Sequence, residues 1–345
     1  MKEHSVLITG ATGAIGREVL KQLYSIQSAA SITVFVRPSK KTKKILKNYT
    51  GIKVVYGNIT NLEDVKRACL NQDYVIHLAA IIPPLADEDV HRTNQVNIEG
   101  TRNVISALEE VSPNAFLLFS SSVACYGDRN KNPDIYTTDP LKPSVGDVYG
   151  VTKIVAEGLI RESKLNWSIY RLSAIMGIGN HKISKLMFHM PLDTIMEICT
   201  IKDTARAFVN SIEKKHQLVH NTYNLGGGER CRVTYEAFIT RAFDAYGMGK
   251  VDFPPNTFAK INFHCGNYAD GQILEDILHF RSDSIDSYFE QFSAAVPGIQ
   301  RFFTRLVNKP VKKLLLRSSE PFQAYKKQDK EMIERFFGGP GVNMS

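Results

Sequence analysis

One stretch of sequence decides the fold of this chain: Val6-Leu7-Ile8-Thr9-Gly10-Ala11-Thr12-Gly13-Ala14-Ile15-Gly16. A short apolar run leads into three glycines spaced three apart, and a helical pattern of apolar residues follows at once. This order predicts a strand, a tight turn and a helix. Glycines let the backbone approach a phosphate closely, and the start of a helix offers unpaired N–H groups with a partial positive charge. The stretch therefore predicts a binding site for a dinucleotide pyrophosphate.

The composition is that of an ordinary globular protein. The 345 residues are 43% hydrophobic and 23% charged, and they can form one large domain or two small ones. The first residues run directly into a strand without the apolar stretch of a signal peptide, and no window reaches the roughly 18 apolar residues of a membrane span. The five cysteines are scattered and never spaced as C-x-x-C. We therefore expect a cytoplasmic protein without a metal site.

The positive charge is concentrated near the C-terminus. The formal net charge is +8, and nine basic but only two acidic residues lie between 301 and 330. The main body is therefore nearly neutral, and we expect no nucleic-acid partner. In the basic segment apolar residues alternate with the cations, a pattern that suits peripheral contact with an anionic membrane. The alternative is a surface helix with solvated lysines, and Asn308-Lys309-Pro310 predicts a break in it.

Alternating strand and helix patterns follow the glycines and predict an α/β fold. The expected strands cover 31–36, 52–56, 74–78, 115–119 and 168–172, and long helices are expected over about 87–108 and 148–162. Asn61 and Asp203 are expected to cap helices. His77 lies inside a strand, and we expect it to pack in the core and not to act in catalysis.

Arg37 indicates which cofactor the site prefers. It follows the second expected strand, about 20 residues past the glycines, where dinucleotide-binding units place the side chain that meets the adenosine ribose. An acidic side chain would accept a hydrogen bond from a free 2′-hydroxyl, whereas a planar guanidinium suits a 2′-phosphate. The sequence thus favours NADP(H), with NAD(H) as the alternative. In the competing interpretation Arg37 and the lysines after it form a solvated face.

Three further residues indicate acid–base chemistry. Tyr149 and Lys153 lie four residues apart at the start of an expected helix, so they share one face. An ammonium at this spacing is expected to lower the pKa of the phenol from about 10 toward working pH. Ser122 comes just after the fifth expected strand, at the edge where ligands bind to open α/β sheets. Ala79 and Ala80 follow the fourth strand, where small side chains let the backbone pass close to a cofactor.

Together with Asn97 in Val96-Asn97-Ile98-Glu99-Gly100-Thr101, these motifs resemble the extended short-chain dehydrogenase/reductase family, the NAD(P)-dependent epimerase/dehydratase-like proteins, from residue 5 to about 245. The resemblance implies a Rossmann-type doubly wound parallel sheet with a smaller C-terminal substrate region. It also implies that Tyr149 transfers the proton at the substrate oxygen, Ser122 holds that oxygen, and Lys153 binds the nicotinamide ribose. The cofactor contacts expected in this way come from Gly10, Thr12, Gly13, Ala14, Ile15, Gly16, Arg37, Asn58, Ile59, Ala79, Ala80, Asn97, Tyr149 and Lys153.

Two positions depart from the family pattern. Asn58 stands where the family usually has Asp, and its amide oxygen can still accept a hydrogen bond from the adenine amino group. Arg171 is followed by Leu172-Ser173 where the family often has a proline. The family often forms dimers through the helices that start near Asp87 and Tyr149, so a homodimer is one expectation.

The motifs divide the chain into three parts. We expect the dinucleotide-binding core over residues 1–172, an interleaved substrate-binding region over 173–300, and a basic helical extension over 301–345. Only a short loop and one apolar segment separate Gly177 from Glu197, which favours a small or apolar substrate over a nucleotide sugar. Arg230 and Arg232 are expected to be solvated loop arginines. The aromatic span over 253–303 predicts either a cap on the substrate pocket or a separate packing layer.

The leading hypothesis is an NADP(H)-dependent oxidoreductase that transfers a hydride between nicotinamide and a carbonyl or secondary alcohol. One alternative is an NAD-dependent nucleotide-sugar epimerase, against which Arg37 and the short segment after Gly177 both argue. Another is a non-catalytic, cofactor-sensing or membrane-associated protein. The presence of Ser122, Tyr149 and Lys153 argues against this last alternative.

Overall fold

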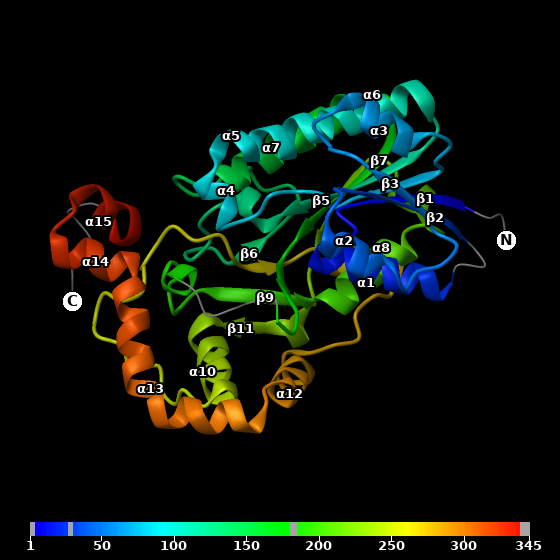
Figure 1. Ribbon diagram of the computed structural model, residues 1–345. Coiled ribbons are helices and arrows are strands. Elements are labelled where there is room, and N and C mark those ends of the chain that lie inside the picture. The colour runs from blue at the N-terminus through cyan, green and yellow to red at the C-terminus, as the bar shows by residue number, and fades with distance from the viewer. Residues whose placement is uncertain (1–3, 27–29, 180–184, 339–345) are drawn as a thin grey trace.

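A seven-stranded parallel sheet forms the centre of the protein, with the strand order β10-β7-β5-β4-β1-β2-β3. The computed structural model describes residues 4–26, 30–179 and 185–338 (Figure 1). Because β1 and β4 are neighbours and the chain crosses from one half of the sheet to the other between them, the expected Rossmann-type doubly wound sheet is confirmed. The strands are β1 (His4–Thr9), β2 (Ala30–Val36), β3 (Lys53–Tyr56), β4 (Tyr74–His77), β5 (Phe116–Ser122), β7 (Asn166–Leu172) and β10 (Asn221–Leu225).

Helices cover both faces of this sheet (Figure 1). Successive β1 side chains alternate between two cores: Val6 and Ile8 pack with the helices on one face, and Leu7 packs with those on the other. The first face holds α1 (Ala14–Ser25), α2 (Lys40–Leu46), α8 (Ile201–Asn210) and α11 (Gln272–Leu278). The second holds α3 (Leu62–Cys69), α6 (Gly100–Val111) and α7 (Val148–Glu162).

The long helix expected from residue 87 to 108 is interrupted. The structure has α4 (Leu85–Glu88), α5 (Val90–Asn94), a π-helical segment η2 (Gln95–Glu99) and then α6. Asp89 has φ −137° and ψ 80°, outside the helical region, and its side chain caps α5. The expectation of one helix is therefore wrong at its N-terminal end, because a polar cap at Asp89 restarts the helix there.

The two expected helix caps differ in outcome. The Asn61 side chain accepts a hydrogen bond from Asp64 N at 3.0 Å and caps α3, as expected. Asp203 does not cap α8; Thr200 does, through a hydrogen bond from Asp203 N at 3.1 Å. The Asp203 carboxylate instead accepts hydrogen bonds from the backbone of Ser282 and Asp283 at 2.8 and 2.9 Å. Asp203 therefore holds a distant loop against the start of the helix.

A smaller region, which contains β9 and β11, lies beneath the central sheet in the view of Figure 1. Its three-stranded sheet has the order β11-β9-β8, and the aromatic residues after 250 pack on it and on α10 as a layer of rings, including Phe253 and Phe258 against Phe188. Most of the aromatic span thus forms a packing layer, whereas Phe302 and Phe303 at its end are exposed. The remaining elements up to residue 295 are η3 (Val123–Tyr126), β6 (Asp134–Ile135), β8 (Ala174–Met176), η4 (Lys185–Phe188), β9 (Ile195–Thr200), α9 (Lys215–Leu218), η5 (Glu229–Cys231), β11 (Arg232–Thr234), α10 (Tyr235–Tyr246), β12 (Asn267–Tyr268) and α12 (Ile285–Ala295).

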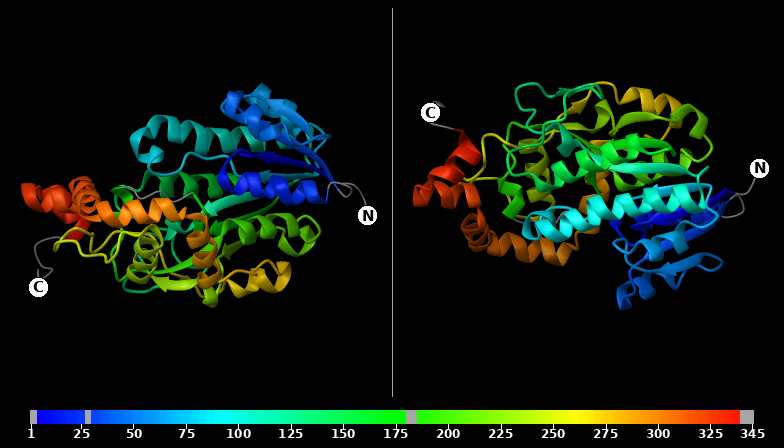
Figure 2. Two further views of the ribbon diagram at one scale, coloured as in Figure 1. Left: turned by 60° about the horizontal axis from the view of Figure 1, so that its bottom comes forward. Right: turned by 90° about the horizontal axis from the view of Figure 1, so that it is seen from above.

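The basic C-terminal segment forms α13 (Gly298–Ser318), α14 (Glu320–Lys327) and α15 (Lys330–Phe337) (Figure 2). The expected break near Pro310 is present: α13 bends at Val307, where φ is −111° and ψ 17°. α14 and α15 fold back on the body, where Ala324, Phe336 and Phe337 bury themselves with Ala259. None of the helices within residues 4–26, 30–179 and 185–338 is long and apolar enough to cross a membrane.

Candidate active site

The glycine turn is pressed against the end of β4. Gly10 has φ +70°, and a Cβ atom there would lie 2.7 Å from Ala79 N. A Cβ on Gly16 would lie 2.2 Å from Gly10 O, so neither position admits a larger residue without a shift. Gly13 donates its N–H to Gly10 O at 2.9 Å and immediately precedes α1. The start of α1 therefore presents its free N–H groups next to closely packed backbone, a cradle that fits a pyrophosphate.

A cavity of about 310 Å³ adjoins this turn. Of the expected cofactor residues, eight line it: Gly10, Thr12, Gly13, Arg37, Asn58, Ile59, Ala79 and Ala80. Ala14, Ile15, Gly16, Asn97, Tyr149 and Lys153 lie outside its lining. The cavity thus runs from the glycine turn past the ends of β2 and β4, the course that a dinucleotide takes in this type of sheet.

Arg92 and Gln95 line the same cavity and were not expected from the sequence. Arg92 comes from α5, which begins after the interruption at Asp89, and Gln95 comes from the π-helical segment η2. Neither Arg37 nor Arg92 makes an ion pair with another of the residues that the structure describes. Two uncompensated guanidinium groups therefore border one cavity, which suits a ligand with more than one phosphate.

The Asn97 side chain is held by other protein groups. Its Nδ2 donates to Ile81 O at 2.9 Å and to Thr152 Oγ1 at 3.1 Å, and its Oδ1 accepts from Ile81 N at 2.8 Å. Three of the four hydrogen-bonding positions of the buried amide are thus taken by protein groups. Asn97 ties the segment after β4 to α7 and so positions the cavity wall and the helix that carries Tyr149.

The structure brings Ser122, Tyr149 and Lys153 together. β5 continues three residues further than expected and ends at Ser122, while Asp147 caps α7 by accepting from Gly150 N at 2.8 Å. The Ser122 side chain lies next to the Tyr149 phenol and acts to lower its pKa, and Ser122 Oγ also accepts from Ala124 N at 3.1 Å. Lys153 Nζ donates to Ser120 O at 2.6 Å and lies 5.7 Å from the centre of the Tyr149 ring. A hydroxyl pair and a buried cation therefore meet at the carboxyl end of the sheet.

The expected effect of Lys153 on the tyrosine pKa is wrong for this arrangement. Burial raises the pKa of Tyr149, and the nearby Cys125 thiol adds to the shift. Burial also lowers the pKa of Lys153, to about 8. The loss of hydration is the largest cause of both shifts. Tyr149 is therefore protonated at neutral pH, the form that can donate a proton to a substrate oxygen.

A buried charge network behind this site is not evident in the sequence. Glu157, on α7, accepts hydrogen bonds from Arg171 at 3.0 and 2.8 Å and from Ser121 Oγ at 2.5 Å. Arg171 also donates to Tyr126 OH at 2.7 Å and to Thr137 O at 3.0 Å. Burial alone would raise the pKa of Glu157, but the hydrogen bonds and charge of Arg171 hold that pKa below its usual value. The network joins β5, α7 and β7 directly behind Ser122.

His77 packs in the core, as expected. Its Nδ1 lies 2.7 Å from Thr9 Oγ1 and its Nε2 lies 3.1 Å from Thr101 Oγ1. Burial lowers the pKa of His77 from 6.5 to about 3, and the charge of Lys153 adds to this shift. The imidazole is therefore neutral in the folded protein at neutral pH.

This burial predicts a pH-dependent stability. Below pH 6.5 His77 binds a proton in the unfolded state but stays neutral in the folded state. The free energy of unfolding that comes from the neutral His77 is therefore fully present above pH 6.5 and decreases as the pH falls toward 3. We expect the free energy of unfolding to lose about 1.4 kcal/mol per pH unit from this group, measured by urea denaturation at pH 7.5 and 5. A His77→Gln variant should lose that part of the slope, whereas a variant of the exposed His91, His91→Gln, should keep it. Equal slopes in both variants would exclude His77 as the source.

Of the two arginines expected to be solvated, only Arg230 is exposed. Arg232 Nε instead lies 3.1 Å from Glu197 Oε2, and its guanidinium also donates to Tyr268 O. The expectation is therefore wrong for Arg232, because β11 pairs with β9 and places Arg232 opposite Glu197. Its charge is already balanced by a buried carboxylate.

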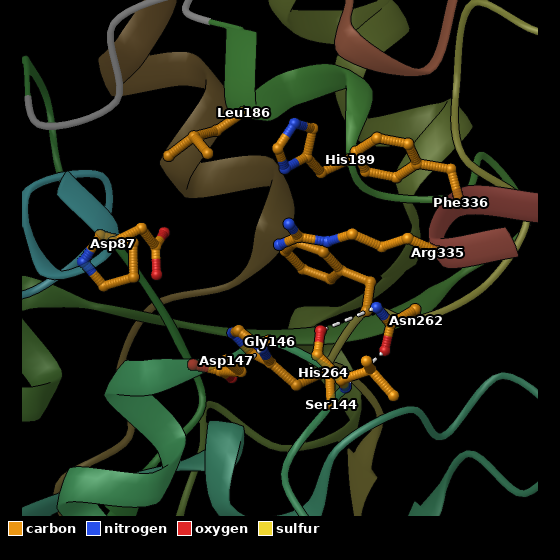
Figure 3. A pocket seen from close by; sticks show the side chains of 13 residues that line it. Asp87, Ser144, Gly146, Asp147, Leu186, His189, Asn262, His264, Arg335 and Phe336 are labelled. Carbon is orange, nitrogen blue, oxygen red and sulfur yellow. Dashed lines mark hydrogen bonds and ion pairs between the residues drawn. The ribbon is translucent and has the colours of Figure 1, made fainter. Parts of the chain in front are cut away.

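A second cavity, of about 140 Å³, lies beside the start of α7 (Figure 3). Asp87, His189 and Arg335 project toward it from separate segments, and Arg335 and Phe336 come from α15. Asp147 Oδ2, at the cap of α7, lies 3.1 Å from His264 Nδ1. The C-terminal extension therefore forms one wall of a pocket two residues from Tyr149.

The comparisons with known proteins agree with this geometry. The pattern of the NAD dependent epimerase/dehydratase family matches residues 6–226. The chain belongs to this family. The matched range begins in β1 and ends just after β10, so the NAD dependent epimerase/dehydratase family covers the whole central sheet and every residue of the Ser122, Tyr149 and Lys153 group.

Two curated relatives are named as steroid or sterol dehydrogenases. A 3-beta-hydroxysteroid dehydrogenase of Mycolicibacterium neoaurum is 31% identical over 195 residues, 53% of this chain and 50% of that protein. A decarboxylating sterol-4-alpha-carboxylate 3-dehydrogenase of Saccharomyces cerevisiae is 29% identical over 168 residues, 46% of each protein. The chain thus matches about half the length of these relatives.

Solved structures of family members share the fold. A UDP-glucuronic acid 4-epimerase from Bacillus cereus, in complex with UDP-glucuronic acid and NAD, superposes with a TM-score of 0.69 at 19% identity, covering 84% of this chain and 99% of that one. A short-chain dehydrogenase/reductase superfamily protein from Agrobacterium tumefaciens with bound NAD gives 0.64 at 19% identity, covering 89% and 99%. At this identity the likeness establishes the fold of the family and nothing finer.

Proposed function

We propose that this protein is an NADP(H)-dependent oxidoreductase that transfers a hydride between nicotinamide and the carbonyl or secondary alcohol of a small or apolar substrate. One observation carries the proposal: Ser122 and Tyr149 lie next to each other, with Lys153 buried beside them, at the carboxyl end of β5. This group supplies a proton at the sheet edge where family members place their chemistry.

The roles of the three residues follow from their contacts. NADP(H) would be held by the glycine turn and Arg37, and it supplies or accepts the hydride. Ser122 orients the substrate oxygen through a hydrogen bond, and Tyr149 donates the proton to it in reduction or takes the proton in oxidation. Lys153 Nζ donates one N–H to Ser120 O. Its other two N–H groups are available to a ribose hydroxyl of the cofactor. The positive charge of the ammonium acts on Tyr149.

The preference for NADP(H) rests on Arg37, and binding titrations test it. We expect Arg37→Ala to weaken NADPH binding about 10- to 100-fold, the range of a lost charge-assisted hydrogen bond, and to leave NADH binding unchanged. Lys41→Ala, which removes an exposed cation outside the cavity, is the matched control. An equal loss for both cofactors would contradict a contact with the 2′-phosphate. NAD(H) that co-purifies with the protein and resists Arg37→Ala would favour the epimerase alternative.

An apolar substrate is supported by two observations. Arg232 is paired with Glu197, so this guanidinium is not available to the diphosphate of a nucleotide sugar. Two relatives are named as steroid or sterol dehydrogenases, and such substrates are largely hydrocarbon. We therefore extend the proposal to a hydrophobic alcohol or ketone, tested by NADPH consumption against a panel of ketones and sterols.

The setting of the protein belongs to the same proposal. We expect a cytoplasmic protein that touches a membrane peripherally, because hydrophobic substrates of this kind partition into lipid. A homodimer through α7 is supported by Val151 and Val155, which lie one turn apart and are 48% and 39% exposed.

A further inference from the structure

The outer face of α13 is unusually apolar. Six of its large apolar side chains are exposed, whereas no other helix in the described ranges exposes more than two. Spacings of three and four residues place the first four on one side of the helix before the bend. The six residues, called here the α13 face, are Ile299, Phe302, Phe303, Leu306, Val307 and Leu314, between 46% and 70% exposed.

The opposite side of α13 is already attached to the body. Val311 and Leu315 pack against the aromatic core around α10 and α12. Arg301 donates to Ala245 O at 3.0 Å and to Ser293 O at 2.9 Å, and Lys312 donates to Lys250 O at 2.6 Å. Polar and apolar contacts thus hold one side of the helix to the body, whereas the α13 face is exposed to solvent. Figure 1 shows α13 at the margin of the molecule.

Cations surround the α13 face. No acidic residue occurs between Gly298 and Ser318. Arg305, Lys309, Lys313 and Arg317 are exposed, and none of them forms an ion pair with another described residue. Large apolar side chains next to uncompensated cations match a bilayer that offers hydrocarbon below and lipid phosphates above. A second copy would bring like charges face to face.

We propose that the α13 face docks the protein on an anionic lipid bilayer. The apolar side chains enter the boundary between headgroups and acyl chains, and the four cations lie at the level of the phosphates. α13 continues into α14 and α15, whose Arg335 and Phe336 line the cavity beside α7. Docking therefore holds the extension that borders this second cavity at the membrane surface. The docking itself does not depend on the proposed function. Only the idea that a hydrophobic substrate reaches the enzyme from the membrane rests on it.

Co-sedimentation of the full chain with vesicles tests the proposal. The protein is expected to bind vesicles of phosphatidylcholine with phosphatidylserine, and to bind less as salt is raised. Phe302→Ser with Phe303→Ser should abolish this binding, and the exposed Ile273 of α11 provides the matched control, Ile273→Ser. Lys309→Glu with Lys313→Glu should weaken binding to the anionic vesicles by at least about fivefold per charge. NADPH binding by each variant checks that it is folded.

Two further measurements separate the outcomes. Tyr149→Phe is expected to keep full vesicle binding while losing turnover, so a failure of the proposed enzyme leaves the docking result readable. Sedimentation equilibrium reports whether Phe302→Ser with Phe303→Ser dissociates an oligomer. Dissociation without any vesicle binding by the natural protein would assign the α13 face to contact between copies and overturn the proposal. Vesicle binding that survives these two substitutions would also overturn it.

Discussion

Tyr149→Phe should bind NADPH as tightly as the natural protein and reduce its substrate about 10²- to 10⁴-fold more slowly. The substitution removes only the hydroxyl beside Ser122, and the ring still fills the same space. The proton for the substrate oxygen would then have to come from water or from Ser122, which is a much weaker acid. The measurement is kcat by NADPH absorbance, together with a cofactor titration.

Tyr136→Phe is the matched control for this loss. Tyr136 is 50% exposed and lies outside both cavities, so its hydroxyl should not affect kcat. Full activity of Tyr149→Phe would contradict the role of Tyr149 as the group that protonates the substrate oxygen. Loss of NADPH binding along with turnover would instead mean that Tyr149 serves the cofactor site.

Glu157→Gln is expected to lower the free energy of unfolding by about 3–5 kcal/mol. The substitution leaves the charge of Arg171 without its partner at a site where Glu157 is fully buried and Arg171 is 2% exposed. Desolvation of the guanidinium is then no longer offset by an opposite charge. Chemical denaturation at pH 7.5 measures the loss.

Glu162→Gln removes an exposed carboxylate from the same helix and should change stability by less than about 0.5 kcal/mol. The pH dependence gives a second test. Because the pKa of Glu157 is lowered in the folded state, its contribution is complete above the unfolded value of 4.5 and is lost as the pH falls through the folded pKa. A Glu157→Gln protein as stable as Glu162→Gln would show that the network does not hold β5, α7 and β7 together.

Local patterns predicted the parts of the site that lie close together along the chain. The glycine turn, the Tyr149 and Lys153 pair on one helix face, and the cap at Asn61 each depend on spacings of three or four residues, which backbone geometry sets directly. The pairing of Ser122 with Tyr149 depended on a strand end and a helix start, and the rule for open α/β sheets predicted their meeting.

Contacts across long sequence separations were not predictable in this way. Arg92 lines the cavity beside the glycine turn, and it comes from α5, a separate short helix that Asp89 caps. Asp203 was expected to cap a helix, but its carboxylate accepts hydrogen bonds from a loop about 80 residues away in the chain. The pKa of Tyr149 moved opposite to expectation, because its burial depends on what the rest of the chain packs around it.

The sequence by itself determined the central sheet, the glycine turn and the helix face that Tyr149 and Lys153 share. These features follow from periodicity, turn chemistry and fixed spacings, which a short window of residues specifies. Only the tertiary structure decided the Glu157–Arg171 network, the wall that α15 adds to the pocket, and the side of α13 that stays exposed. Burial and charge pairing depend on contacts between segments that are far apart in the sequence, and a short window of residues does not specify those contacts.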